Sequence, residues 1–292
     1  MVSDNRPMPL IDASTLRTLL TGSNPVLLDV RWSLADGADH GAYSAGHVPG
    51  AVFVDVDEDL CGRPGPDGRH PLPEVAALQD RLRRSGIAAN SAVVVYDGGD
   101  MLAAARAWWT LRWAGIAEVK VLDGGYPAWI AADGPVSTDE VTPQPGDIVV
   151  TPGSLPVLDA AGAAEWAEDR TLVDVRAAAR YRGEVEPIDP VAGHIPGAVN
   201  HPDTDLIAPG GGFINADARR RELADLPRDI AVYCGSGITA ARAALAVAST
   251  DRPIPPVYIG SWSGWIASGD RPVARGEAAA GDLATLAEFL AT

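Results

Sequence analysis

Short runs of β-branched and aliphatic residues alternate along the chain with longer stretches whose apolar residues recur every three or four positions. Runs with so few polar interruptions are typical of strands buried on both faces of a parallel sheet. The intervening stretches have the period of helices that pack against such a sheet. Strands are expected at 26–30, 51–54, 92–96, 119–123, 171–175, 231–234 and 256–260, and helices at 72–86, 101–115, 217–226 and 239–249. The pattern predicts an α/β fold.

The pattern occurs twice, and four motifs recur with it in the same order. They are DVR (29–31 and 174–176), GHVPGA and GHIPGA (46–51 and 193–198), VVVYDGG and IAVYCGS (93–99 and 230–236), and DGGYPAW and GSWSGW (123–129 and 260–265). The distance between copies suits a duplicated domain rather than a short structural repeat. We therefore expect an N-terminal domain over 1–134, a linker rich in Pro, Thr and Gly over 135–154, and a C-terminal domain over 155–292.

Composition narrows the possible partners. Of 292 residues, 47% are hydrophobic and 21% charged, which is a globular composition. The net charge of −16 disfavours nucleic acid and anionic membrane surfaces as partners. The first ten residues do not resemble a signal peptide, and no apolar run approaches the ~20 residues of a membrane span. The two cysteines, Cys61 and Cys234, suggest neither a disulfide framework nor a zinc site, so a cytoplasmic protein is expected.

Cys234 stands where an α/β protein places its chemistry, after a strand and before a helix. Gly235 and Gly237 allow the chain to turn tightly, and Thr239 is expected to cap the helix. The N–H groups of such a loop converge on an anion and favour a thiolate over a thiol. The alternative is a cysteine buried in the core at the end of a strand. The first copy has Asp97 at the matching position, which predicts a single active site, in the second copy.

In sequence and order, these motifs resemble those of the tandem rhodanese-domain sulfurtransferases, which include thiosulfate and 3-mercaptopyruvate sulfurtransferases. The resemblance covers both halves of the chain. It implies two rhodanese folds, a persulfide formed on Cys234, and no metal or organic cofactor. It also implies a small anionic sulfur donor and an acceptor that is cyanide or a thiol; the sequence does not decide among cyanide, a small thiol and thioredoxin.

The loop sequence CGSGIT at 234–239 is similar to the CGSGVT loop of the mercaptopyruvate enzymes, whereas thiosulfate enzymes more often have cationic side chains in it. By the same resemblance, Ser236, His70 and Asp57 assist the cysteine. Arg180 matches the arginine that binds the donor anion, together with the loop residues Gly235, Gly237, Ile238 and Thr239. Read without the resemblance, His70 is a histidine of a surface loop and Arg180 an arginine on a solvated helix.

One departure from the family leaves a thiosulfate-specific rhodanese open. The segment 183–193 is shorter than usual, and Ile188 and Asp189 stand where a second donor-binding arginine is expected.

Two other function classes fit the sequence poorly. A related phosphatase would need an arginine six positions after the cysteine, but Ala240 stands there and Arg242 comes too late. A non-catalytic binding module would not need a cysteine in a glycine-rich loop. Cys61, in an undistinguished context, is interpreted as a bystander.

Overall fold

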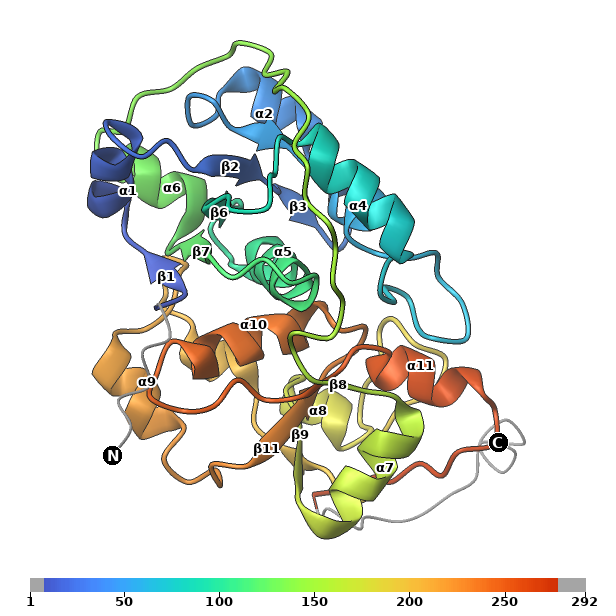
Figure 1. Cartoon of the computed structure of the whole chain (residues 1–292). Helices are drawn as coiled ribbons and strands as arrows, with labels where there is room; N and C mark the ends of the chain where they lie inside the picture. The colour runs from blue at the N-terminus through green and yellow to red at the C-terminus, as the bar shows by residue number, and fades with distance from the viewer. Residues whose placement is uncertain (1–7, 278–292) are drawn as a thin grey trace, which may run out of the picture. The chain divides into compact units, whose positions relative to one another are not determined.

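The computed structural model describes residues 8–277, and these divide into two compact units (Figure 1). The first unit comprises residues 8–62, 72–155 and 207–215, and the second comprises 63–71, 156–206 and 216–277. Each unit therefore contains one copy of the repeat together with a short segment from the other copy. A division by sequence position alone does not anticipate this exchange of segments 63–71 and 207–215.

The first unit is built on a sheet of five parallel strands. Their order is β1 (Leu10–Ile11), β7 (Val119–Leu122), β6 (Val93–Tyr96), β2 (Val26–Asp29) and β5 (Val52–Phe53). The helices are α1 (Ala13–Leu20), α2 (His40–Ala45), α3 (Val56–Asp59), α4 (Val75–Arg84), α5 (Leu102–Trp113) and α6 (Gly125–Ala131). A short antiparallel pair, β3 (Trp32–Ser33) and β4 (Gly37–Ala38), completes the unit.

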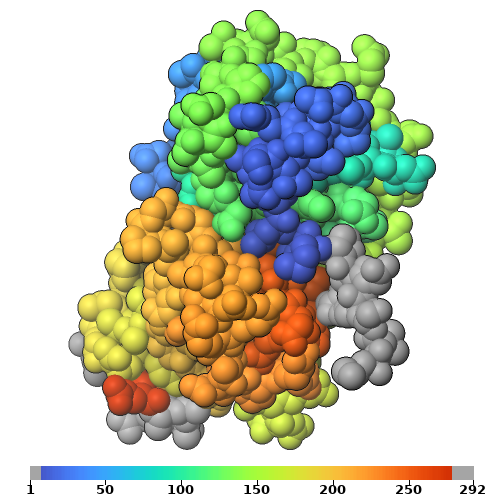
Figure 2. Space-filling model, turned by 90° about the vertical axis from the view of Figure 1, so that its left-hand side faces the viewer, coloured from blue at the N-terminus to red at the C-terminus, as the bar shows by residue number. Residues whose placement is uncertain are grey.

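The second unit repeats this topology. Its parallel strands follow in the order β10 (Val199–Asn200), β9 (Thr171–Asp174), β11 (Ile230–Tyr233), β12 (Val257–Tyr258) and β8 (Val157–Leu158). The helices are α7 (Ala160–Asp169), α8 (Ala178–Tyr181), the 3₁₀ helix η1 (Asp203–Leu206), α9 (Ala216–Glu222), α10 (Ile238–Ala248) and α11 (Ser261–Ala267). The exposed helix α9 is part of the surface shown in orange in Figure 2.

Helices pack on the sheets because successive strand residues face opposite sides and nearly all of them are apolar. In the first unit α1 and α6 share a core with strands β2 and β6, and in the second α7 and α11 do so with β9 and β11. Helices α5 and α10 are buried along almost their whole length, and their small alanine side chains allow close packing. Four helices begin after an aspartate whose carboxylate accepts a helix N–H: Asp12, Asp39, Asp55 and Asp159.

The α/β class, the parallel sheets and the duplication are confirmed. Among residues 8–277, no helix is both long and apolar enough to cross a membrane.

Candidate active site

Cys234 lies at the carboxyl end of β11, the central strand of the second sheet, and its side chain is buried. The backbone N–H of Gly237 donates to Cys234 Sγ at 3.1 Å. Gly237 has φ +87°, a left-handed conformation that glycine adopts without strain, and this turn brings its N–H back to the sulfur. The Ser261 hydroxyl lies 3.8 Å from the same sulfur and accepts the Cys234 N–H at 3.0 Å.

The start of α11 holds the cysteine loop in place. The N–H groups of Trp262 and Ser263 donate to the carbonyls of Cys234 and Gly235, both at 2.9 Å. Ser261 has φ +52°, which is uncommon for a residue other than glycine and costs on the order of 1–2 kcal/mol. The surrounding hydrogen bonds maintain this conformation. The GSWSGW motif thus positions the loop, as well as placing two tryptophans in the core.

The prediction that Thr239 caps α10 is wrong. The helix starts at Ile238, its N-cap is Gly237, and no side chain caps it. The left-handed turn at Gly237 leads directly into the helix, so Thr239 already lies within the first turn.

Ser236 and His70 come together as the sequence suggested. His70 Nδ1 lies 2.8 Å from Ser236 Oγ, within hydrogen-bond distance, although 166 positions separate the two residues. Both belong to the second unit, because segment 63–71 is part of that unit. Asp57 belongs to the first unit, where its Oδ2 accepts a hydrogen bond from Trp32 Nε1 at 2.7 Å. An interaction of Asp57 with His70 stays a prediction.

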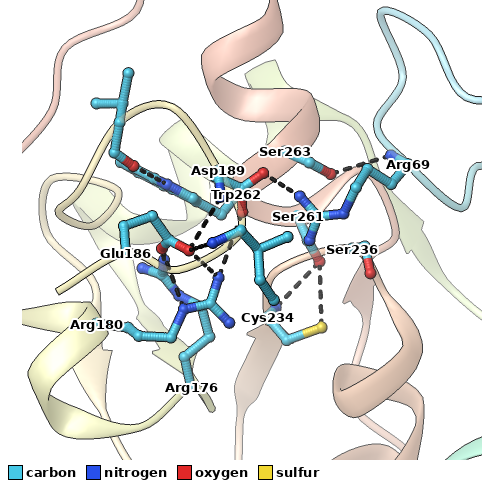
Figure 3. Close-up of polar contacts among 12 residues, drawn as sticks. Arg69, Arg176, Arg180, Glu186, Asp189, Cys234, Ser236, Ser261, Trp262 and Ser263 are labelled. Carbon is cyan, nitrogen blue, oxygen red and sulfur yellow. Dashed lines mark hydrogen bonds and ion pairs between the residues drawn. The ribbon is translucent and has the colours of Figure 1, made fainter. Parts of the chain in front are cut away.

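Arg180 projects from α8 into a cluster of charged side chains beside the cysteine loop (Figure 3). Glu186 binds it through two hydrogen bonds, at 2.6 and 3.1 Å, and Asp189 lies 3.4 Å from Nη2. Arg69 pairs with the other oxygen of Asp189. Burial raises the pKa of the Asp189 carboxyl, and the charge of Glu186 adds to this effect, while the two arginines lower the pKa.

The two arginines converge on the residue that follows the cysteine. A Cβ placed on Gly235 would lie 3.2 Å from Arg69 Nη2 and 3.5 Å from Arg180 Nη2. A glycine at this position therefore lets both guanidinium groups lie against the loop.

Asp97 occupies the equivalent position in the first unit, directly after β6. Its fully buried carboxylate accepts hydrogen bonds from the N–H groups of Gly99 (2.9 Å), Met101 (3.3 Å) and Ala104 (3.0 Å). Burial raises the pKa of this carboxyl to about 6, and the nearby charge of Asp100 contributes. The N–H groups that could bind an external anion are thus directed to a side chain of the protein itself.

A family model described as a rhodanese-like domain matches residues 12–132 and 159–268. The chain belongs to the rhodanese family. A Mycobacterium tuberculosis protein named "Putative thiosulfate sulfurtransferase SseB" is 44% identical over 94% of this chain and 99% of its own length. A Pseudomonas aeruginosa protein named "Probable 3-mercaptopyruvate sulfurtransferase" is 41% identical over 92% of this chain and 98% of its own.

A solved structure extends the similarity to three dimensions. The crystal structure of SseA from Escherichia coli, described with the 3-mercaptopyruvate sulfotransferases, superposes with a TM-score of 0.77 at 29% identity. The superposition covers 88% of this chain and 100% of the SseA chain. With two rhodanese domains and relatives of this kind along nearly its whole length, the protein is a sulfurtransferase.

Sequence reasoning missed two charged residues near the cysteine of this rhodanese, Arg69 and Glu186, and it noted Asp189 only as a replacement for an expected arginine. Arg69 directly precedes His70 in the sequence. The prediction of His70 as a site residue could therefore have indicated Arg69 as well. Arg69 supplies a second guanidinium group near the cysteine, although segment 183–193 contains no arginine. Glu186 follows two arginines in sequence and contacts both, Arg180 at 2.6 Å and Arg176 at 3.3 Å.

The other candidates have ordinary structural surroundings. Cys61 is buried in the first unit, and burial raises the pKa of its thiol, which disfavours the reactive thiolate. Arg242, considered above for a phosphatase, is buried on α10 and forms an ion pair with Asp203 at 2.7 Å. Residues 8–277 contain no group of three or more His, Cys, Asp or Glu side chains placed to hold a metal ion.

Proposed function

We propose that this rhodanese carries sulfur as a persulfide on Cys234, takes it from a small anionic donor and passes it to cyanide or a thiol. The observation that carries the proposal is the Gly237 N–H directed at Cys234 Sγ at 3.1 Å, at the beginning of α10. A backbone donor at a helix N-terminus stabilises a thiolate and, later, the negative charge of a persulfide.

The charges of the site favour a donor with a single negative charge. Arg69 and Arg180 face the carboxylates of Glu186 and Asp189, so the four charges cancel. A monoanion such as 3-mercaptopyruvate adds less repulsion toward the thiolate than the dianion thiosulfate. We propose that Arg69 and Arg180 together bind the carboxylate of the donor.

With 3-mercaptopyruvate the chemistry also requires a proton. The Cys234 thiolate attacks the donor sulfur, the S–C bond breaks and its electron pair forms the enolate of pyruvate. The proton of the donor thiol ends on the enolate carbon, which yields pyruvate and a persulfide anion. We propose that Ser236 and His70, which lie within hydrogen-bond distance of each other, relay this proton and that Asp57 orients the imidazole. The acceptor then attacks the outer sulfur and releases the thiolate.

Thiosulfate is the second candidate donor. The relative with 44% identity is named for thiosulfate, and two guanidinium groups beside Gly235 could also bind a sulfonate. Transfer from thiosulfate would release sulfite and need no proton relay.

Intact-protein mass spectrometry after incubation with 3-mercaptopyruvate tests the proposal. We expect a gain of about 32 Da, one sulfur atom, in the wild type and in Cys61→Ser, and none in Cys234→Ser. Adding cyanide should remove the extra mass and form thiocyanate. A gain that persists in Cys234→Ser would exclude Cys234 as the carrier. The Cys61→Ser variant is the matched control because it removes the other thiol of the chain.

A further inference from the structure

Asp189 lies between the two guanidinium groups that flank the cysteine loop (Figure 3). One carboxylate oxygen pairs with Arg69 Nη1 and the other lies 3.4 Å from Arg180 Nη2. The Asp189 side chain is 4% exposed, whereas Arg69 and Arg180 are 27% and 16% exposed. The arginines are thus accessible to a small molecule, and the carboxylate between them is not.

The neighbouring carboxylate, Glu186, is held far more firmly. It makes two hydrogen bonds to Arg180 and one to Arg176, and it accepts the N–H groups of Ile188 and Asp189, both at 3.2 Å. These contacts give Glu186 a structural role. The carboxylate of Asp189 has two ion pairs, one of them long, and can be displaced at lower cost.

The pair of cations that holds Asp189 is also the pair nearest to Gly235. An anionic donor whose sulfur reaches Cys234 must therefore bind guanidinium groups that an internal carboxylate already occupies. Burial raises the pKa of the Asp189 carboxyl, so its ionised form depends on these two arginines. A bound donor would weaken the ion pairs of Asp189 and be repelled by its charge.

We propose that Asp189 is a donor-specificity residue, an internal carboxylate that competes with the donor for Arg69 and Arg180 and selects against dianions. The inference rests on the proposed function, because it assumes that the donor binds at these arginines. With Asp189 ionised, Arg69, Arg180, Glu186 and Asp189 have no net charge. Removing the charge of Asp189 leaves one net positive charge, whose attraction for a dianion is twice that for a monoanion at the same distance.

Steady-state kinetics of Asp189→Asn with both donors test this specificity. We expect the ratio of kcat/KM for thiosulfate to that for 3-mercaptopyruvate to rise about tenfold, with neither KM increasing. Glu184→Gln is the matched control, since it removes one negative charge from an exposed side chain of the same segment that pairs with Arg182. It should leave the ratio unchanged, as should Asp189→Glu, which retains the charge.

Binding of inert anions separates this inference from the persulfide chemistry. Calorimetry with sulfate and pyruvate, which cannot donate sulfur, should show tighter sulfate binding to Asp189→Asn than to the wild type, and a smaller gain for pyruvate. If Asp189 only positions Arg69, both KM values rise together and the proposal is wrong. An unchanged donor ratio or unchanged sulfate affinity also overturns it. Should Asp189→Asn fail to fold, as judged by thermal melting, Asp189→Ser provides the same neutral substitution with a smaller side chain.

Discussion

Cys234 and Asp97 follow equivalent strands, and the two side chains interact differently with the N–H groups of their loops. At Cys234 one N–H reaches the sulfur, and the cysteine is followed by a glycine over which two arginines lie. At Asp97 three N–H groups bind a carboxylate of the chain itself. The residue after the strand is thus a thiol in one unit and a carboxylate in the other, and in the first unit that carboxylate occupies the N–H groups of its own loop.

Also at the residue scale, the bond between His70 and Ser236 leads to a prediction about proton transfer. We expect His70→Ala and Ser236→Ala to lower kcat with 3-mercaptopyruvate about a hundredfold, the usual contribution of a general acid. The loss with thiosulfate should be at least tenfold smaller, because sulfite leaves without a proton. Steady-state rates with both donors measure this difference. His201→Ala, which changes a partly exposed histidine of the same unit, is the control. Equal losses with the two donors would contradict a proton relay.

At the scale of elements, each sheet brings its loops together at the carboxyl ends of its strands. The loop after β11 is hydrogen-bonded to the start of α11, while α8 and the residues that follow it supply Arg180, Glu186 and Asp189. In the first unit the equivalent loop after β6 leads into α5, and the carboxylate of Asp97 binds the N–H of Ala104 in the first turn of that helix.

The buried carboxyl before α5 predicts a pH dependence of stability. The pKa of Asp97 rises from 3.8 to about 6 on folding, so between these values the folded protein binds the proton more tightly than the unfolded chain. The contribution of Asp97 to the free energy of unfolding should therefore fall as the pH rises from about 4 to 6, by roughly 3 kcal/mol, and it is absent at higher pH.

Denaturant unfolding of the wild type and Asp97→Asn at several pH values measures the effect of Asp97. The wild-type free energy of unfolding minus that of the variant should decrease between about pH 4 and 6 and then level off. The exposed Asp80→Asn on α4 is the control and should give a constant difference. A constant difference for Asp97→Asn as well would show that burial does not shift the titration of this carboxyl.

At the scale of the whole molecule, the net charge of −16 acts on every anionic donor that approaches. Carboxylates neutralise the arginines near Cys234, so these arginines offset the negative electrostatic potential of the protein only partly. A dianion is repelled about twice as strongly as a monoanion at the same distance.

Donor preference should therefore depend on ionic strength. We expect kcat/KM for 3-mercaptopyruvate to exceed that for thiosulfate by tenfold or more, about 1.4 kcal/mol in transition-state binding. Salt screens the long-range repulsion, so the preference should narrow roughly two- to threefold between low salt and 0.15 M. Rates with both donors at equal cyanide concentration and stepped ionic strength test both statements. A higher rate with thiosulfate at low salt would contradict the charge argument.

The sequence by itself determined the α/β class, the duplication and the place of Cys234 at the end of a strand. Strand and helix patterns depend on neighbouring residues, and the repeat places the same motifs in the same elements, so these features can be predicted locally. The same local reasoning was wrong about Thr239, because Gly237 already turns the chain into α10.

Only the tertiary structure decided which charged side chains meet at the cysteine. Arg69 and His70 lie in a segment that packs with the other copy of the repeat, where they reach Asp189 and Ser236. Asp189 pairs with Arg69 as well as Arg180 because this segment packs beside it, although Arg69 and Asp189 are 120 positions apart in the sequence. Hydrophobic periodicity contains no information about such long-range ion pairs, because they are formed by long, partly exposed side chains that no sheet or helix pattern constrains.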